Sequence, residues 1–209
     1  MTGGEEGNIL LIRNREVKMK KWPYLIFLIF TGCMPVYYSG RVLNKGEKEI
    51  GAGIGAPLYI RRGFGDGWDA GVDVGLFSIG LDIRKRVIKR GNNELAVAGG
   101  AGIVAFPILI SGVSSSFMLS VRFDRLTLAG GYGYSRYDYP ENETQTFPKD
   151  LNHYAHGIFS HAGVESRIYR HFHIYPFVGY YYMKDDLGYS FSRFFLGMGF
   201  FFRSVREEK

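Results

Sequence analysis

The sequence predicts an all-β protein: an antiparallel up-and-down transmembrane β-barrel of eight strands, with ten as the alternative count, preceded by a signal peptide. Three observations predict it. Apolar residues alternate with small or polar ones in segment after segment, as in strands with one apolar face. Glycine and aromatic residues are abundant, with 29 Gly, 15 Tyr and 17 Phe. A short apolar run near the N-terminus ends at the only cysteine.

The N-terminal residues 1–32 do not belong to the predicted barrel. A signal peptide begins within a few residues of its lysines, so we expect residues 1–18 not to be translated and the chain to start at Met19. Residues 19–32 then form the signal peptide. Its apolar run, 24–30, is too short for a membrane-spanning helix, and the small pair Thr31-Gly32 suits a cleavage site.

Cys33 follows that small pair directly. Thr31-Gly32-Cys33 resembles the lipobox of bacterial lipoproteins, with Phe30 where that family usually has Leu. The resemblance implies that the Cys33 thiol is diacylated, that the chain is cut before it and that the new amino terminus is acylated. The alternative is a buried cysteine in an ordinary N-terminal strand, although a lone thiol in an exported protein invites oxidation.

The mature chain fits one domain of ordinary size. We expect residues 33–46 to be an acylated linker, 47–203 the β-barrel domain and 204–209 a polar tail. Leaving out the five basic and three acidic residues of 1–32 lowers the formal charge from +6 to +4. Such a mild excess does not call for a nucleic-acid partner.

The barrel domain consists of alternating segments. Nine are predicted, at 48–60, 68–77, 79–89, 94–105, 115–123, 126–138, 155–168, 171–183 and 190–203. In the first, even-numbered residues from Ile50 to Ile60 form the apolar face. In the second, the even-numbered residues from Trp68 to Leu76 do the same, and in the third the apolar face is Ile79, Leu81 and Ile83. The fifth and ninth alternate equally clearly, so each segment has one apolar face.

The composition of the opposite face indicates which way the apolar face points. A soluble barrel fills its water-facing side with Lys, Glu, Gln and Thr. Here that side holds Gly, Ser, Tyr and isolated Asp, Glu and Arg, which suit a crowded interior. The apolar face would then meet lipid, and only a closed sheet pairs every backbone N–H and C=O in hydrocarbon.

Nine is an odd number, which bacterial barrels avoid. Joining the second and third segments into one strand bent at Gly75 or Gly80 leaves eight. With this count the turns 90–93, 124–125 and 169–171 lie at one end of the barrel. The longer connections 61–67, 106–114, 139–154 and 184–189 lie at the other end, as expected for short periplasmic turns and long outer loops. The aromatic residues Tyr59, Trp68, Tyr134, Tyr137, Tyr139, Tyr154, Tyr180, Tyr182 and Tyr189 then gather at the outer rim.

With this pattern, the chain resembles the small bacterial outer-membrane β-barrel superfamily, and its lipoprotein-tagged members most closely. The resemblance implies a location in the outer membrane, an N-terminal lipid anchor on the periplasmic side, and contact with outer-membrane lipid and the barrel-assembly and lipoprotein-sorting machinery. Two features depart from it. The family often ends on an aromatic residue, whereas here Phe202 is followed by "RSVREEK". Pro57 and Pro176 fall inside predicted strands and require a bulge or strand end.

Charged residues on the inward faces are the candidate functional residues. They are Asp73, Asp82, Arg84, Arg86, Arg122, Asp124, Glu165, Arg167 and Arg193. One interpretation is a network of paired ions that fills and stiffens a narrow barrel, because unpaired charges there would be costly. The other is a narrow polar pore. Eight strands leave a bore that side chains fill, which favours the filled lumen.

Catalytic patterns are sparse. His161 and Glu165 would both face the lumen, and some outer-membrane barrels act on lipid A with Ser, His and acid groups, but Ser160 would face lipid. The "GAGIG" of 51–55 alternates within a strand and so does not match a phosphate-binding loop. We therefore expect no catalytic residues, no metal site and no cofactor.

The predicted function is a lipid-anchored outer-membrane barrel with a structural, adhesive or envelope-maintenance role, not an enzyme. The main alternative is a periplasmic lipocalin-like lipoprotein that binds an apolar ligand and turns its apolar faces inward. A lipid A-modifying hydrolase or a narrow polar pore is the second alternative. The sequence predicts no oligomeric state.

Overall fold

The computed structural model describes residues 40–54, 56–75, 78–106, 110–138, 153–186, 188 and 190–204, and in these ranges the regular structure is all β. The strands are β1 (Lys48–Ile54), β2 (Ala56–Gly65), β3 (Trp68–Val74), β4 (Ser78–Arg90), β5 (Asn93–Phe106), β6 (Ile110–Phe123), β7 (Leu126–Asp138), β8 (His153–Val164), β9 (Ser166–Tyr169), β10 (Phe172–Asp185) and β11 (Ser190–Ser204). No helix in the described ranges is long and apolar enough to cross a membrane.

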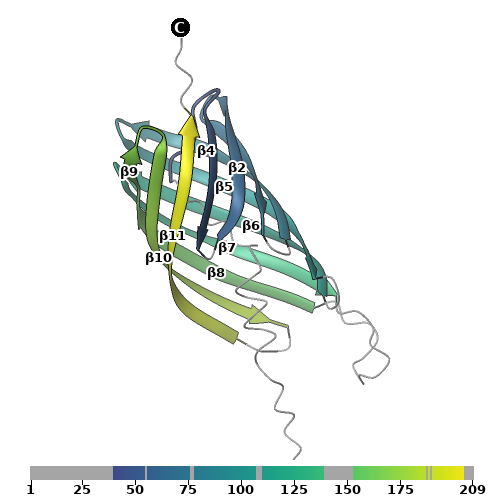
Figure 1. Ribbon diagram of the computed structural model, residues 1–209. Coiled ribbons are helices and arrows are strands. Elements are labelled where there is room, and N and C mark those ends of the chain that lie inside the picture. Colours follow the sequence, from purple (N-terminus) through teal and green to yellow (C-terminus); the bar gives the residue numbers. More distant parts are fainter. Residues whose placement is uncertain are drawn as a thin grey trace, which may run out of the picture.

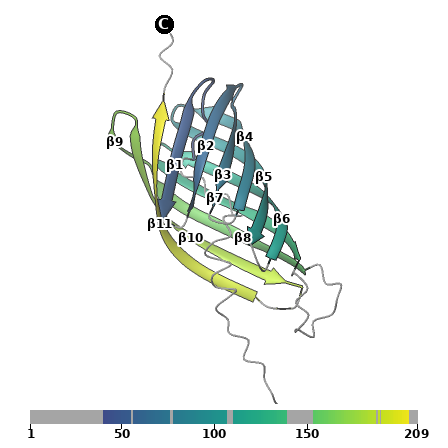
Figure 2. The same ribbon diagram turned by 45° about the vertical axis from the view of Figure 1, so that its right-hand side comes forward.

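The strands form a closed barrel (Figures 1 and 2). Neighbouring strands are antiparallel: consecutive strands pair from β1 to β8, β10 pairs with β11, and β1 pairs with β11 from Lys48↔Ser204 to Ile54↔Met198, which closes the sheet. Both β8 and β9 pair with β10, so they occupy one position in the wall, interrupted at Glu165. The barrel therefore has ten strand positions, and the up-and-down all-β prediction is confirmed.

The preferred count of eight strands was wrong, for two reasons. Segment 48–60 is not one strand: it contains the β1–β2 hairpin, in which Gly51 pairs with Tyr59 and Gly53 with Ala56. The segments 68–77 and 79–89 are not one bent strand either. Val74 pairs antiparallel with Ile79, and the Gly75 N–H donates to the Ser78 carbonyl at 2.8 Å, which closes a turn.

The two ends of the barrel differ in their connections. The end with two-residue turns at 66–67, 91–92, 124–125 and 170–171, here called the short-turn end, also holds the start of β1 and the end of β11. Asp66, Gly67, Gly91 and Asp124 take positive φ there, as tight hairpin turns require. The opposite, long-loop end carries the connection 139–152, which lies outside the described residues.

The predicted placement of 90–93, 124–125 and 169–171 at one end agrees with the structure. The placement of 61–67 among the long loops was wrong. Its residues 61–65 belong to β2, and only 66 and 67 form the turn, at the short-turn end. The placement of Tyr59 in the outer aromatic rim was also wrong, because its side chain lies inside the barrel and the residue is 6% exposed.

The apolar faces point outward, as predicted. Along β6, Phe117 and Leu119 are 57% and 45% exposed, whereas Met118 and Ser120 on the other face are 1% and 4% exposed. Pro176 lies where the ladder of β10 passes from β9 to β8. A proline cannot donate to the ladder, which explains why the wall strand is interrupted opposite it.

Candidate functional site in the barrel lumen

Charged side chains from neighbouring strands converge in the lumen near the short-turn end. Asp69 on β3 is fully buried and lies between two arginines. Arg61 Nη1 on β2 donates to Asp69 Oδ1 at 2.8 Å, and Arg84 on β4 donates to both carboxylate oxygens at 2.8 and 2.6 Å. Arg61 Nη2 also donates to Asp82 Oδ2 at 2.6 Å. This group therefore joins three consecutive strands through buried, charge-assisted hydrogen bonds.

A second group joins the other side of the lumen. Arg203 on β11 donates to Glu49 Oε2 on β1 at 2.9 and 2.7 Å, and to Glu165 Oε1 at 2.7 Å. Glu165 also lies 3.3 Å from Arg122 Nη1 and 3.0 Å from His173 Nδ1. The hydroxyl of Tyr59 donates to Glu49 at 2.9 Å. Glu165 occupies the interruption between β8 and β9, and its carboxylate meets Arg122 of β6, Arg203 of β11 and the ring of His173 on β10.

Residues 40–47, here called the inner segment, cross the lumen beside these ion pairs. The Val42 N–H donates to Glu94 Oε1 at 2.6 Å, and the Leu43 N–H donates to Asp69 Oδ2 at 2.7 Å. Arg86 donates to the Val42 carbonyl at 2.6 Å and to Glu94 Oε2 at 2.8 Å. Val42 and Leu43 are both fully buried. The inner segment thus fills the lumen at the short-turn end.

Glu47 fixes the turn that leads the inner segment into β1. Its carboxylate accepts hydrogen bonds from the Arg41 guanidinium at 2.5 Å and from the Asn44 N–H at 2.7 Å. Burial alone would raise the pKa of Glu47. The Asn44 N–H and the Arg41 charge outweigh burial and hold the pKa of Glu47 below its usual range.

Aromatic and apolar side chains fill the lumen beyond the charged groups. Tyr59, Tyr175, Phe177 and Phe201 form one buried cluster, with Phe195 packed against it. Ala98, Met118, Ala129 and Phe159 form another, with Tyr181 packed against it. Glycines make room for these rings: a Cβ at Gly163 would lie 2.3 Å from the Tyr175 ring, and one at Gly197 would lie 2.2 Å from the Phe177 ring.

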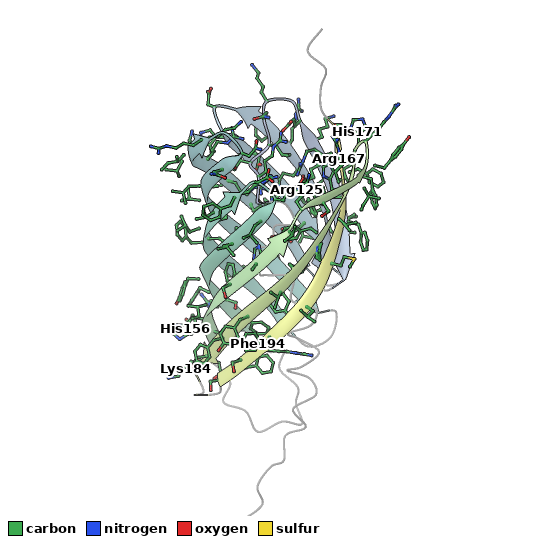
Figure 3. All side chains as sticks on the ribbon, turned by 90° about the vertical axis from the view of Figure 1, so that its left-hand side faces the viewer. Arg125, His156, Arg167, His171, Lys184 and Phe194 are labelled. Atoms are coloured by element: carbon green, nitrogen blue, oxygen red, sulfur yellow. The ribbon has the colours of Figure 1, made fainter. Side chains whose placement is uncertain are left out.

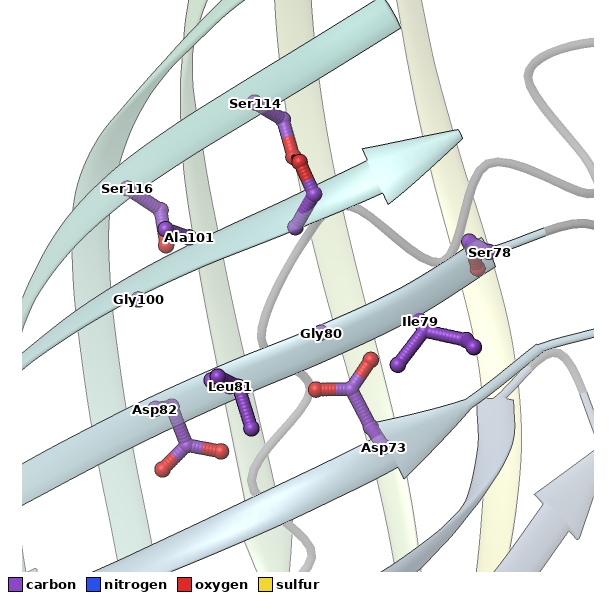
Figure 4. Close-up of a pocket in the computed structure, with 11 residues that line it drawn as sticks. Asp73, Ser78, Ile79, Gly80, Leu81, Asp82, Gly100, Ala101, Ser114 and Ser116 are labelled. Carbon is purple, nitrogen blue, oxygen red and sulfur yellow. Dashed lines mark hydrogen bonds between the residues drawn. The ribbon is translucent and has the colours of Figure 1, made fainter. Parts of the chain in front are cut away.

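A hollow in the lumen wall of β3 to β6 contains Asp73 and three serines (Figure 4). Ser78, Ser114 and Ser116 line it together with Asp82, and Gly80, Gly100 and Gly102 form its floor. Its free volume, open to solvent, is about 310 Å³. The Ser78 hydroxyl, 6% exposed as a residue, makes no hydrogen bond within the described residues.

The structure brings most of the predicted charged residues together. Asp82, Arg84, Arg86, Arg122 and Glu165 lie in the ion-pair groups, and Asp73 lines the hollow.

Three of the predicted residues lie elsewhere. Asp124 is exposed in the β6–β7 turn with φ of 52°, and Arg167 is exposed on β9 beyond the interruption. Arg193 is exposed near the start of β11, at the long-loop end. Alternation indicates the face of a residue but not its depth in the lumen, so it does not separate these three residues from those in the ion-pair groups.

Sequence reasoning missed five buried partners: Glu49, Arg61, Asp69, Glu94 and Arg203. A usable signal existed. Continuing the period of two from Gly51 and Tyr59 places Glu49 and Arg61 on the inward face of β1 and β2. Asp69 similarly shares its face with Asp73. Ion-pair partners could have been sought by matching inward charges of opposite sign on adjacent strands.

The residues that suggested catalysis do not form a catalytic group. His161 is buried and makes edge contacts with the rings of Tyr175 and Phe177. Glu165 is engaged by Arg203, and Ser160 faces outward. Among the described residues, no group of three or more His, Cys, Asp or Glu side chains is placed to hold a metal ion.

Comparison with known proteins gives a similarity in structure. No family model and no curated protein matches the chain. Among solved structures, the chain is similar to the outer-membrane expressed OmpT of Vibrio cholerae, with 14% sequence identity and a TM-score of 0.32. The similarity covers 73% of this chain and 56% of that one, so the chain spans little more than half the length of the protein that it matches.

Proposed function

We propose that this chain is a lipid-anchored outer-membrane β-barrel with a structural, adhesive or envelope-maintenance role, not an enzyme. The observation that carries the proposal is the apolar outer surface of a closed barrel. Large apolar side chains stand exposed around it, among them Leu81 at 61%, Phe194 at 74% and Leu196 at 83%. A soluble protein rarely exposes a continuous apolar surface, whereas a membrane barrel needs one.

The direction of the faces also favours the membrane barrel over the lipocalin-like alternative. A cup for an apolar ligand needs apolar side chains around an open interior. Here the interior holds buried ion pairs such as Arg61–Asp69 and Arg203–Glu49, and its aromatic residues pack against one another. The apolar residues Leu119 and Ile158 point outward instead, at 45% and 55% exposure.

The filled lumen favours a structural role over the pore alternative. The inner segment, the ion pairs and the aromatic clusters lie across the lumen in succession. A conducting pore would need these groups to move aside, which would leave buried charges without partners.

The position of the inner segment suits a lipid anchor at the short-turn end. Gly40 approaches Thr127, near the start of β7 at that end. Cys33 precedes Gly40 by seven residues, a reach of at most roughly 25 Å for an extended chain. If the short turns face the periplasm, acyl chains on Cys33 can enter the adjacent leaflet. This anchor rests on the Thr31-Gly32-Cys33 motif.

The experiment that tests the anchor replaces its thiol. Cys33→Ala should abolish incorporation of labelled fatty acid and leave an uncleaved precursor in the inner membrane. A control, Cys33→Ala with Ser39→Cys, restores a thiol outside the motif and should stay unlabelled. Normal processing and labelling of Cys33→Ala would show that the lipobox assignment is wrong.

The outer-membrane barrel is tested separately by extraction. Detergent should be required to release the protein from outer-membrane fractions, even when the acylated N-terminus has been removed by proteolysis. Release without detergent after that cleavage would favour a soluble lipoprotein and contradict the transmembrane barrel.

A further inference from the structure

Among the described residues, the short-turn end of the barrel exposes many more cations than carboxylates. Its exposed cations are Lys45, Lys48, Arg62, Lys89, Arg90, Arg125, Arg167 and Arg170. The exposed carboxylates described at this end are Asp66 and Asp124. Figure 3 shows Arg125 and Arg167 together at this end and Lys184 at the opposite end. Most carboxylates near these cations point into the lumen, where other arginines already pair with them.

Three outward cations lie on the strands to either side of Trp68, two on β1 and β2 and one on β4. Lys48 on β1 lies directly opposite Arg62 on β2, and Arg62 lies opposite Ala70, the outward neighbour of Trp68 on β3. On the other side Lys85 pairs with Trp68, and its Nζ lies 4.5 Å from the ring centroid. We call Lys48, Arg62, Lys85 and Trp68 the basic patch.

Within the described residues, no carboxylate compensates this positive charge. Like charges directly opposite each other on adjacent strands destabilise a sheet. The salt bridges formed within the described residues join none of the three cations to a carboxylate. Lys85 Nζ donates a hydrogen bond to the Asp66 carbonyl at 2.8 Å. This bond uses one N–H of the ammonium group but does not neutralise its positive charge. An anion from outside the chain would remove the repulsion.

The surroundings of the basic patch indicate what kind of anion fits. The next outward row toward the barrel middle contains the paired residues Ile50 and Ile60, which are 48% and 54% exposed. Trp68 itself is 40% exposed, and an indole ring beside a cation favours the boundary between hydrocarbon and headgroups. A ligand that covers both the basic patch and this apolar row has a phosphate at one end and an acyl chain at the other.

We propose that the basic patch binds the phosphate of an anionic phospholipid in the leaflet at the short-turn end. This inference rests on the proposed membrane barrel. The Arg62 guanidinium suits two phosphate oxygens at once, and Lys48 and Lys85 add point charges on either side. The acyl chains of the same lipid cover Ile50 and Ile60. Free phosphate would leave the apolar row uncovered, so the lipid is the ligand.

Trp68 makes the proposal directly measurable. The chain has two tryptophans, Trp22 and Trp68, so Trp22→Phe in the full chain leaves Trp68 as the only indole. This protein is refolded into vesicles of phosphatidylcholine containing a minor share of phosphatidylglycerol. In parallel samples, either lipid carries bromine near the headgroup end of its acyl chains, and quenching of Trp68 reports which lipid lies beside it. Lys48→Gln with Arg62→Gln is the test variant, because Lys85 contacts the indole and is left in place.

We expect phosphatidylglycerol to be enriched beside Trp68 by about fivefold over its bulk share, the effect of roughly one surface cation, and more if both cations contribute fully. The double variant should lose most of this enrichment, as should the wild type at high salt. A matched control, Arg136→Gln with Lys184→Gln at the long-loop end, should keep it.

The outcomes separate this inference from the proposed function. Quenching by each brominated lipid in proportion to its bulk share, or enrichment that survives in Lys48→Gln with Arg62→Gln, would overturn the lipid site and leave the membrane barrel standing. Absence of quenching by any brominated lipid in a folded protein would overturn the membrane barrel itself.

Discussion

Asp69 shows at the scale of one residue why the lumen is stable. It has no exposed surface, and its two oxygens accept hydrogen bonds from Arg61, Arg84 and the Leu43 N–H. Breaking a buried ion pair by removing one partner is costly because the other charge remains buried. Asp69 is engaged by two cations and by the inner segment, so its loss affects the wall and the segment together.

Asp69→Asn should lower the free energy of unfolding by about 3–5 kcal/mol, because two buried guanidinium groups lose the charge they share. Urea unfolding in detergent micelles, followed by Trp68 fluorescence, measures the change. Asp124→Asn removes the same charge from an exposed turn, where Asn also tolerates the positive φ of 52°, and should change stability by no more than about 0.5 kcal/mol. Equal effects of the two variants would contradict a structural role for the ion-pair network.

Glu47 makes the stability of the inner segment depend on pH in the acid range. Its pKa in the folded protein lies below the ordinary value of 4.5, so the folded state binds the Glu47 proton less readily than the unfolded chain. The stabilisation is therefore complete above about pH 4.5 and is lost as pH falls through the lowered pKa. Hydrogen exchange of the Val42 and Leu43 amides should accelerate below pH 4.5 relative to amides in β6. In Glu47→Gln it should be fast already at neutral pH; unchanged protection in that variant would exclude this role.

At the scale of elements, the sequence predicted strand faces well and strand number poorly. In β1 and β2 the even-numbered residues point outward on both sides of the hairpin, as the pairing of Ile50 with Ile60 requires. The alternation therefore continues unchanged through the turn, and the sequence pattern does not indicate that β1 and β2 are two strands. The β3–β4 hairpin did leave a signal: the outward residues change from even, ending at Val74, to odd, starting at Ile79. A continuous strand keeps its parity unless it contains a bulge, so this change favoured a turn.

Strand β6 provides the direct test of which face meets lipid. Leu119 is 45% exposed, whereas Ser120 is 4% exposed and Arg122 lies 3.3 Å from Glu165 inside the barrel. Single cysteine probes at positions 119 and 121 should be quenched by lipid-borne labels in reconstituted bilayers, and probes at 120 and 122 should not. Quenching at 120 and 122 but not at 119 and 121 would mean that the polar face meets lipid and the apolar face lies inside the barrel.

At the scale of the whole molecule, the closed barrel and its two unlike ends could be predicted, but the contents of the lumen could not. The alternation shows that Arg84 and Glu165 face inward, but nothing local shows that Arg84 meets Asp69 while Glu165 meets Arg203 on β11, beyond β10. Those pairings depend on the register of many strands at once. The inner segment was assigned to a linker because residues 40–46 lack alternation, and its burial arises only from the barrel around it.

The orientation of the molecule is tested by protease protection. If the long loops face outward, a protease of broad specificity added to intact cells should cut within 139–152 and leave 91–92 uncut, since exposed polar loops are cleaved most readily. Both sites should be cut after permeabilisation, which is the control. Cleavage at 91–92 in intact cells, with 139–152 protected, would mean that the barrel is inverted in the membrane.

The pairing of β1 with β11 also sets an order of events during biogenesis. Glu49 and Arg203 are 154 positions apart, and their ion pair joins the first strand to the last. Until the final strand arrives, the sheet has two open edges, which hydrocarbon does not tolerate. Closure therefore requires β11, the last strand in the sequence. The ion pair between Arg203 and Glu49 then joins the two edges where they meet.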